Sequence, residues 1–417
     1  MKINIKNKIF TNGIYLYILQ IFNTVIPLIT LPYITRVLGI EQYGVFSKTL
    51  NYVTYFHAFV EYGFTLLGAR KITLAENNKI EISKIFSAIT YSKILNSIIS
   101  FSVLAVVGLF ALEREQQYQC LLILTIWIFS EVFTQTYIFQ GLQDMKFIMA
   151  VNVISRTVST VLTFIFVKNP EDILIYAILY VVTNVLSAFL GTALIVGKFK
   201  IRLTKPNYKD IVDVYKEGFP LFTTSFASKI CSGFTVTALG FFCTDAVIGG
   251  YTAIQKIPYI LVIMFAPVGQ VIYPYICKLY ETNIELAIRR IKKILLAILV
   301  VCAVGFLTML FLKDVMIRIV YGEEYLPYSN LIIPLSLWLV FSITNNILGI
   351  QILVARGNQK EYSVCFIISI IALVIFNLVL CYMFGAWGGA IATAVGELTL
   401  TCCCLYVIWK KRLLNIN

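Results

Sequence analysis

Charged residues and histidine are scarce in this sequence. Only 13% of the 417 residues are charged and His57 is the single histidine, whereas 59% of the residues are hydrophobic. Because soluble domains carry about 25% charged and about 45–50% apolar residues, this composition excludes a soluble globular protein. One histidine among scattered carboxylates offers no ligand cluster, so neither a metal ion nor a cofactor is expected.

Nucleotide-binding and disulfide motifs are also missing. The segment most similar to a phosphate-binding loop, GTALIVGKF at 191–199, has one residue too many between its glycines and a phenylalanine in place of Ser or Thr. Most of the ten cysteines lie inside apolar runs without a CxxC pair, and we interpret them as small apolar side chains. ATP is therefore not expected to drive this protein directly.

Long apolar runs take up most of the chain. A hydrocarbon core about 30 Å thick requires about 20 apolar residues per helix, and this length predicts an all-α polytopic membrane protein with about twelve transmembrane helices. We interpret the first run as a span rather than as a removable signal peptide. The expected limits are 10–35, 43–68, 94–112, 119–141, 147–167, 173–197, 218–242, 247–277, 294–312, 329–354, 362–384 and 387–409.

Basic residues are distributed unevenly between the two sides of the predicted bundle. The net charge is +13, and most Lys and Arg residues fall on the side of the N-terminus. Because basic loops stay in the cytoplasm, both termini are expected to be cytoplasmic. The same rule accounts for the positive charge, so nucleic acid is not expected as a partner.

The two halves of the chain show weak internal similarity. GIEQYGVFSKT at 39–49 resembles DAVIGGYTAIQ at 245–255, so that Gly44 aligns with Gly250. Secondary transporters are commonly built from such repeats, and we expect two pseudo-symmetric six-helix lobes. The expected division is an N-terminal lobe, a cytoplasmic amphipathic linker and a C-terminal lobe, at 1–200, 201–217 and 218–417.

Four segments resemble a known family of transporters. They are LITLPYITRVLGIEQYGVFS at 28–47, FQGLQDMKF at 139–147, EGFPLFTTS at 217–225 and VARGNQKEYS at 354–363. In length, span count and the order of these segments, the chain resembles Wzx-type flippases, the lipid-linked O-antigen translocases of the polysaccharide transporter family. That family belongs to the multidrug/oligosaccharidyl-lipid/polysaccharide exporter superfamily, which also holds the MATE exporters.

The resemblance implies a function and a setting. It implies that undecaprenyl-diphosphate-linked oligosaccharide units, O-antigen or similar, move from the cytoplasmic to the periplasmic leaflet of a bacterial inner membrane. It also implies two lobes around a central cavity that work by alternating access, without an enzymatic reaction. Membrane lipids, a polymerase, a chain-length regulator and a coupling proton or sodium ion are the partners that this setting suggests.

Ionisable residues within the predicted spans are functional candidates, because each costs about 2.5–3.5 kcal/mol to insert. Glu131 and Arg156 flank the turn near Asp144 at nearly equal distances, which predicts similar depths on adjacent antiparallel helices. They are expected either to form a structural ion pair or to line the cavity.

Three lysines form the predicted substrate site. Lys48 shares a helical face with three polar and aromatic residues, Asn51, Tyr52 and Tyr55. This face suits a hydrated cavity in which rings stack on sugars and the ammonium binds phosphate. The alternative is a packing face from which Lys48 reaches the membrane surface. Lys256, in the corresponding span of the second half, and Lys229 complete the predicted diphosphate site.

The opposite face of the Lys48 helix carries His57 and Glu61, one turn apart. A carboxylate beside an imidazole in a low dielectric can exchange a proton near neutral pH, so this pair predicts a proton or sodium relay. An internal hydrogen-bonded pair is the alternative. Glu397, midway along the last span, is the expected counterpart in the C-terminal lobe.

Two other functions fit parts of the sequence. An ion-coupled small-molecule exporter of the MATE type would share the predicted architecture, but lysines at the predicted site favour an anionic cargo. A membrane polysaccharide polymerase would need a sugar-handling site outside the bilayer. The longest predicted periplasmic connection is short and has neither a histidine nor a DxD motif, which makes the polymerase the weaker alternative.

Overall fold

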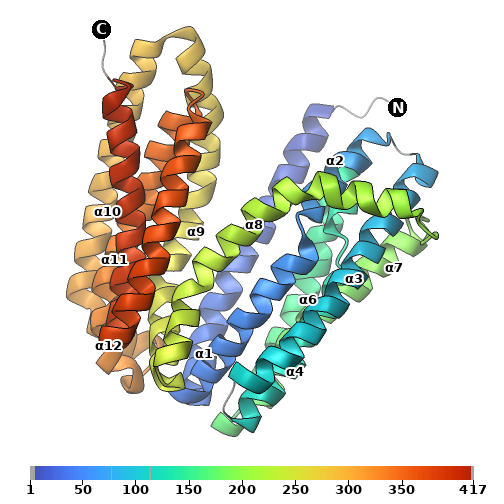
Figure 1. The fold of residues 1–417 in the computed structure, drawn as a ribbon, viewed down its shortest axis with the longest axis horizontal. Helices are drawn as coiled ribbons and strands as arrows, with labels where there is room; N and C mark the ends of the chain where they lie inside the picture. The colour runs from blue at the N-terminus through green and yellow to red at the C-terminus, as the bar shows by residue number, and fades with distance from the viewer. Residues whose placement is uncertain (1–4, 77, 112–113, 415–417) are drawn as a thin grey trace. The chain divides into compact units, whose positions relative to one another are not determined.

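The computed structural model describes residues 5–76, 78–111 and 114–414, and every regular element among them is a helix (Figure 1). The two chain ends, which are expected to be cytoplasmic, lie outside these residues. The chain divides into two compact units, Met1–Ser232 and Gly233–Asn417. The boundary lies within α8 (Tyr208–Phe242). Because α8 begins at Tyr208, it also includes part of the linker expected at 201–217. The expected division into lobes and linker stays a prediction.

The first unit is a bundle whose helices pack around α4 and α7. Helix α4 contacts α1, α3 and α7, whereas α6 contacts α1 and α7. A short 3-10 helix, η1, precedes α7 and contacts α1. The helices are α1 (Ile5–Glu61), α2 (Phe64–Leu74), α3 (Lys79–Ala111), α4 (Glu115–Phe133), α5 (Thr136–Gly141), α6 (Met145–Phe166), η1 (Pro170–Asp172) and α7 (Ile173–Gly197).

The second unit is built around α11, which contacts α9, α10 and α12. A 3-10 helix, η2, precedes α11, and a π-helix, η3, continues it. The elements are α9 (Asp245–Thr282), α10 (Ile284–Val320), η2 (Glu323–Leu331), α11 (Ile332–Asn345), η3 (Asn346–Val354) and α12 (Gln359–Lys410).

Glycines divide the two longest helices. The backbone leaves the helical region at Gly39 of α1 (φ 73°) and at Gly385 of α12 (φ 55°). Positive φ costs a residue with a Cβ free energy, which explains glycine at both bends. Each bend falls between two spans expected from the sequence. Within the described residues nine helical segments are long and apolar enough to cross a membrane, so the count of twelve is not confirmed.

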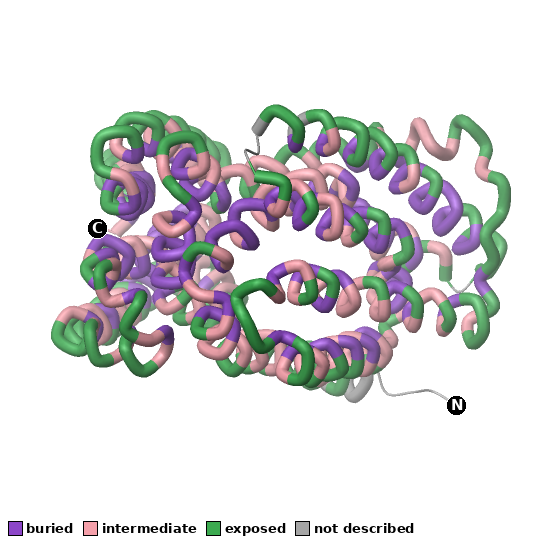
Figure 2. The backbone as a smooth tube through the Cα atoms, turned by 90° about the horizontal axis from the view of Figure 1, so that it is seen from below, coloured by how far each residue is buried: buried purple, intermediate pink, exposed green. Residues whose placement is uncertain are grey.

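Figure 2 shows exposed segments along the outside of the helices and buried segments between them, and many of the exposed residues are large apolar ones. Phe311 and Trp409 are 78% and 76% exposed, and many Ile, Leu and Val side chains share this surface. A water-soluble monomer rarely exposes so many large apolar side chains. The chain is therefore a multi-pass membrane protein whose outer surface contacts lipid.

The bend at Gly385 gives a test of the backbone argument. Replacing Gly385 with alanine is expected to lower the free energy of unfolding by about 1–2 kcal/mol, because alanine resists positive φ. Gly305→Ala, in α10, is the matched control, since no atom lies within 4 Å of its added Cβ. Thermal unfolding in detergent should show a loss only for Gly385→Ala; equal midpoints would contradict the assignment.

Candidate functional site

A buried ion pair joins α3 to α4 in the first unit. Lys93 has no exposed surface and Glu131 is 7% exposed. The Lys93 Nζ donates to Glu131 Oε1 at 2.7 Å. A buried ammonium without a partner would be very costly, so each charge makes the other tolerable inside the bundle.

The Lys93 ammonium also closes a break in the helical backbone. Helix α4 ends at Phe133 and α5 begins at Thr136, so carbonyl groups at the end of α4 lose their helical partners. Lys93 Nζ donates to the Glu131 carbonyl at 3.1 Å and to the Thr134 carbonyl at 3.2 Å. All three N–H groups of the ammonium therefore have acceptors.

His57 occupies the other oxygen of the same carboxylate. Its Nε2 lies 3.1 Å from Glu131 Oε2. An ionised carboxylate only accepts, so Nε2 carries the proton in this contact. The imidazole stacks on Trp127 with ring centroids 4.3 Å apart. The cluster of Lys93, Glu131 and His57, called the charged triad below, thus links α1, α3 and α4.

The expected pair of Glu131 and Arg156 is not formed in the structure. Arg156 Nη1 instead donates to the Asn23 carbonyl at 3.4 Å. The two residues were predicted to lie at equal depth on adjacent helices, but α4 packs on α1, α3 and α7 while α6 packs on α1 and α7. Lys93, on α3, is the cation that reaches Glu131.

Glu61 is not the carboxylate that accompanies His57. Its Oε2 accepts from the Gly63 N–H at 2.8 Å and its Oε1 from the Thr65 N–H at 3.0 Å. These amides open α2, directly after the chain turns at Tyr62 (φ 48°) and Gly63 (φ 71°). Glu61 therefore caps a helix start. The expected pairing of His57 with Glu61 is not formed, since His57 contacts Glu131 instead, and the role of His57 and Glu61 in ion coupling stays a prediction.

The face of α1 that carries Lys48 is largely covered within the first unit. Lys48 is 7% exposed, and Asn51, Tyr52 and Tyr55 are partly buried. Asn51 Nδ2 donates to the Tyr55 hydroxyl at 3.4 Å. The role of these residues in binding substrate stays a prediction.

The other two predicted lysines are exposed. Lys229 lies on α8 and Lys256 on α9. The Lys256 Nζ is 5.7 Å from the centroid of the Tyr259 ring, which lies nearly parallel to Trp338 of α11 at 6.4 Å. An exposed cation thus lies next to the Tyr259 ring, and that ring lies next to Trp338. These three residues of the second unit are called the aromatic–lysine site below.

Glu397 belongs to a polar cluster where α11 passes into the π-helix. Asn345 Nδ2 donates to the Glu397 carboxylate at 2.6 Å and to the Glu397 carbonyl at 2.9 Å. The Thr401 hydroxyl donates to Asn345 Oδ1 at 2.8 Å. The side chain of Asn345 is thereby held on both of its polar atoms, and Glu397 has an amide rather than a cation as its partner.

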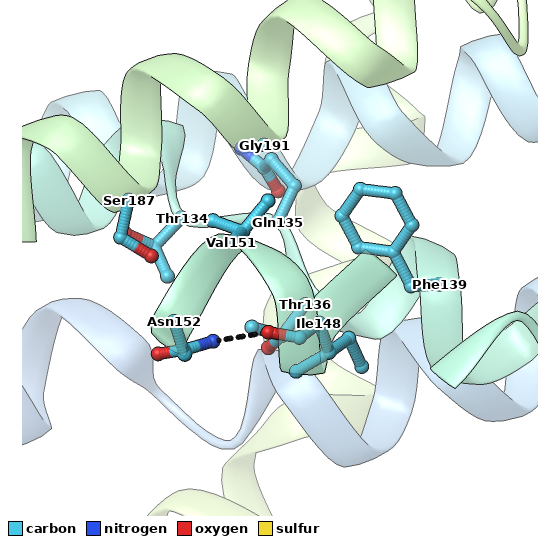
Figure 3. Close-up of a pocket in the computed structure, with 9 residues that line it drawn as sticks. All are labelled: Thr134, Gln135, Thr136, Phe139, Ile148, Val151, Asn152, Ser187 and Gly191. Atoms are coloured by element: carbon cyan, nitrogen blue, oxygen red, sulfur yellow. Dashed lines mark hydrogen bonds between the residues drawn. The ribbon is translucent and has the colours of Figure 1, made fainter. Parts of the chain in front are cut away.

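A small pocket lies beside the break between α4 and α5. Figure 3 shows Thr134 and Gln135 from the break facing Asn152 of α6 and Ser187 of α7. The buried Gln135 Oε1 has no hydrogen-bond partner. The pocket measures about 10 Å³, which is room for one water molecule. It is too small for a sugar, so it is not the substrate site.

The sequence also matches known proteins. Residues 9–280 match the model of a family described as polysaccharide biosynthesis protein. The chain belongs to this family. It is 28% identical over 411 residues to a protein of Escherichia coli (strain K12) named "Putative O-antigen transporter", covering 97% of each chain.

Two solved structures share the fold. The lipid II flippase MurJ, in an inward closed conformation, matches with a TM-score of 0.73 and 17% identity, over 96% of this chain and 87% of that chain. An inward-facing multidrug resistance MATE family transporter of the MOP superfamily matches with a TM-score of 0.67 and 14% identity, over 94% and 98%. The membrane-transporter fold expected from the sequence is thereby confirmed.

Two members of these sites were missed by sequence reasoning. Lys93 lies at the edge of a predicted span, where a lysine is ordinary, and only the packing of α3 on α4 brings it to Glu131. Trp338 lies in an apolar run without any local signal, and the packing of α11 on α9 brings it to Tyr259. Both contacts are long-range.

The charged triad gives a stability test. Lys93→Met is expected to lower the free energy of unfolding by about 3–5 kcal/mol, because it leaves the Glu131 carboxylate buried without its cation. Lys93→Met combined with Glu131→Gln should cost less than the sum of the single changes. Denaturation in detergent measures all three variants.

The ion pair of Lys71 and Glu217, with Nζ and Oε1 2.8 Å apart and Glu217 half exposed, provides the control. Lys71→Met should cost less than about 1 kcal/mol. Equal losses for Lys71→Met and Lys93→Met, or additive effects in the double variant, would contradict the account of the charged triad.

Proposed function

We propose that this protein is a flippase for undecaprenyl-diphosphate-linked oligosaccharide units, O-antigen or similar. In this proposal it moves them from the cytoplasmic to the periplasmic leaflet of a bacterial inner membrane by alternating access. The family match and the O-antigen transporter relative support a role in polysaccharide export. The likeness to a lipid II flippase supports a fold able to move lipid-linked sugars. No chemical step is assigned to any residue.

The aromatic–lysine site is the single observation that carries this proposal. A lysine ammonium binds phosphate as a compact charge, and aromatic rings provide flat apolar faces for sugar rings. Lys256, Tyr259 and Trp338 place both features within one unit, on α9 and α11. A diphosphate joined to a sugar would place its phosphates near the Lys256 ammonium and its sugar rings near Tyr259 and Trp338.

Lys229, exposed on α8 of the first unit, stays a proposed substrate contact in its own right. Lys48 is buried, so in this proposal Lys48 and its neighbours Asn51, Tyr52 and Tyr55 meet the substrate only in a second conformation of α1. In α9, Pro258 and Pro267 remove helical hydrogen bonds and so permit this helix to bend as well. The π-helix after α11 is a second irregular segment, of a kind that is frequent at functional sites.

Energy for export is proposed to come from an ion gradient. His57 and Glu131 place an imidazole on a carboxylate inside the first unit, where one proton would change the local charge. Glu397 with Asn345 is the corresponding proposed site in the second unit. A proton is the ion proposed at His57, because an imidazole can take up a proton on its second ring nitrogen.

A small-molecule exporter of the MATE type is the second candidate, favoured by the shared fold. The exposed cation at the aromatic–lysine site argues against the lipophilic cations that such a protein would carry. A polymerase and a chain-length regulator of the same pathway remain proposed partners.

Export of polysaccharide tests the proposal. Deletion of the gene should abolish surface polymer and leave lipid-linked units in the cytoplasmic leaflet. Complementation by Lys256→Gln or Trp338→Ala should export about tenfold less than wild type, since each removes a contact to substrate. Surface polymer and the leaflet of the lipid-linked units are the quantities to measure.

Lys256→Arg keeps the cation and should restore export, while Lys292→Gln, an exposed lysine on α10, should behave as wild type. Normal polymer in the deletion strain would reject the flippase in favour of the exporter. Full rescue by Lys256→Gln and Trp338→Ala would keep the function and remove the aromatic–lysine site from it.

A change of pH tests the ion proposal separately. His57→Gln removes the imidazole that would carry the proton, but the glutamine amide can still donate a hydrogen bond to Glu131, so transport should no longer respond to an imposed pH gradient. Transport of lipid-linked units into vesicles with an imposed pH gradient is the measurement. If wild-type transport is the same with and without proton and sodium gradients, the proposal that an ion gradient drives export is rejected.

A further inference from the structure

A groove of about 530 Å³ opens between the two arms of α12 on either side of Gly385. Val364 and Ile368 line it from the first arm, and Cys402 and Tyr406 from the second. All four side chains are exposed. A concave apolar surface of this size, on the outside of a membrane-spanning hairpin, fits a hydrocarbon chain.

One end of the groove carries positive charge. Lys360 lines it, and Lys410 lies above the Tyr406 ring with its Nζ 5.8 Å from the centroid. Glu361 also lines this end, but Lys411 pairs with it and donates to Asn358 Oδ1 at 2.6 Å. Neither Lys360 nor Lys410 forms an ion pair within the described part of the chain, so this end of the groove keeps a net positive charge.

The groove is too short for a molecule that crosses the membrane. Its wall on the first arm runs from Lys360 to Ile368, which is about 12 Å at 1.5 Å per residue. The hydrocarbon core is about 30 Å thick. An occupant of the groove therefore stays within one leaflet, which favours a resident lipid over a translocated one.

We propose that this groove binds one anionic phospholipid of the surrounding bilayer. An acyl chain lies along Val364 and Ile368, and the phosphate lies near Lys360 and Lys410. Basic residues at the end of an apolar groove between transmembrane helices are the combination that recognises anionic headgroups. The inference does not depend on which substrate the protein transports.

Binding of two phospholipids to the full-length protein tests the inference. Native mass spectrometry of the detergent-solubilised protein, titrated with phosphatidylglycerol or phosphatidylethanolamine, measures the affinity of each. Wild type should retain one phosphatidylglycerol more tightly than phosphatidylethanolamine. Lys360→Gln and Lys410→Gln should each weaken phosphatidylglycerol binding about fivefold and together remove the preference.

Two further variants separate the groove from the general surface. Val364→Trp fills the groove and should displace the bound lipid, whereas Ile371→Trp, an exposed position on the same arm outside the groove, should not. Lys292→Gln, on α10, is the control for loss of a lysine. Thermal unfolding shows that each variant is folded before its binding is compared.

Three results would overturn the inference. They are equal retention of both phospholipids by wild type, unchanged retention in Val364→Trp, and displacement of phosphatidylglycerol by an equal concentration of undecaprenyl phosphate. The last result would assign the groove to the carrier lipid instead. Export assays do not enter this test, so the groove and the proposed flippase function fail independently.

Discussion

Within a bilayer every backbone N–H and C=O group must find its partner inside the protein, because no water is present to replace a lost hydrogen bond. Besides the bend at Gly39, the first unit nevertheless contains breaks after Phe133 in α4 and after Glu61 in α1. Lys93 supplies donors to the carbonyls of one break, and the Glu61 carboxylate accepts from the amides of the other. Charged side chains within the bundle thus make an irregular backbone tolerable.

The charges of the chain therefore divide by task. Lys93 and Glu61 act on the backbone, and Glu131 holds Lys93 in place while presenting its second oxygen to His57. Lys256 and Lys229 are exposed. This division explains why depth in a span alone does not identify a functional residue: a buried charge that completes a helix end and an exposed charge that meets a ligand look alike in sequence.

Much of the fold could be predicted from sequence, because the length and spacing of apolar runs are local properties. The bends at Gly39 and Gly385 also lie where the apolar runs were expected to part. Partners could not be predicted in the same way. Glu131 was paired with Arg156 from depth along neighbouring spans, but the packing of α3 against α4 decides the contact. Trp338 depends on the packing of α11 against α9.

The Lys93 ammonium has a consequence for sequence variation. Its three N–H groups meet one carboxylate oxygen and two carbonyls arranged around a single point. The planar fork of an arginine cannot reproduce this tripod, and a neutral residue would leave both the carboxylate and the helix end unmatched. Any change at Lys93 therefore disturbs Glu131 and the irregular backbone at Thr134 at the same time, so the three form one structural unit.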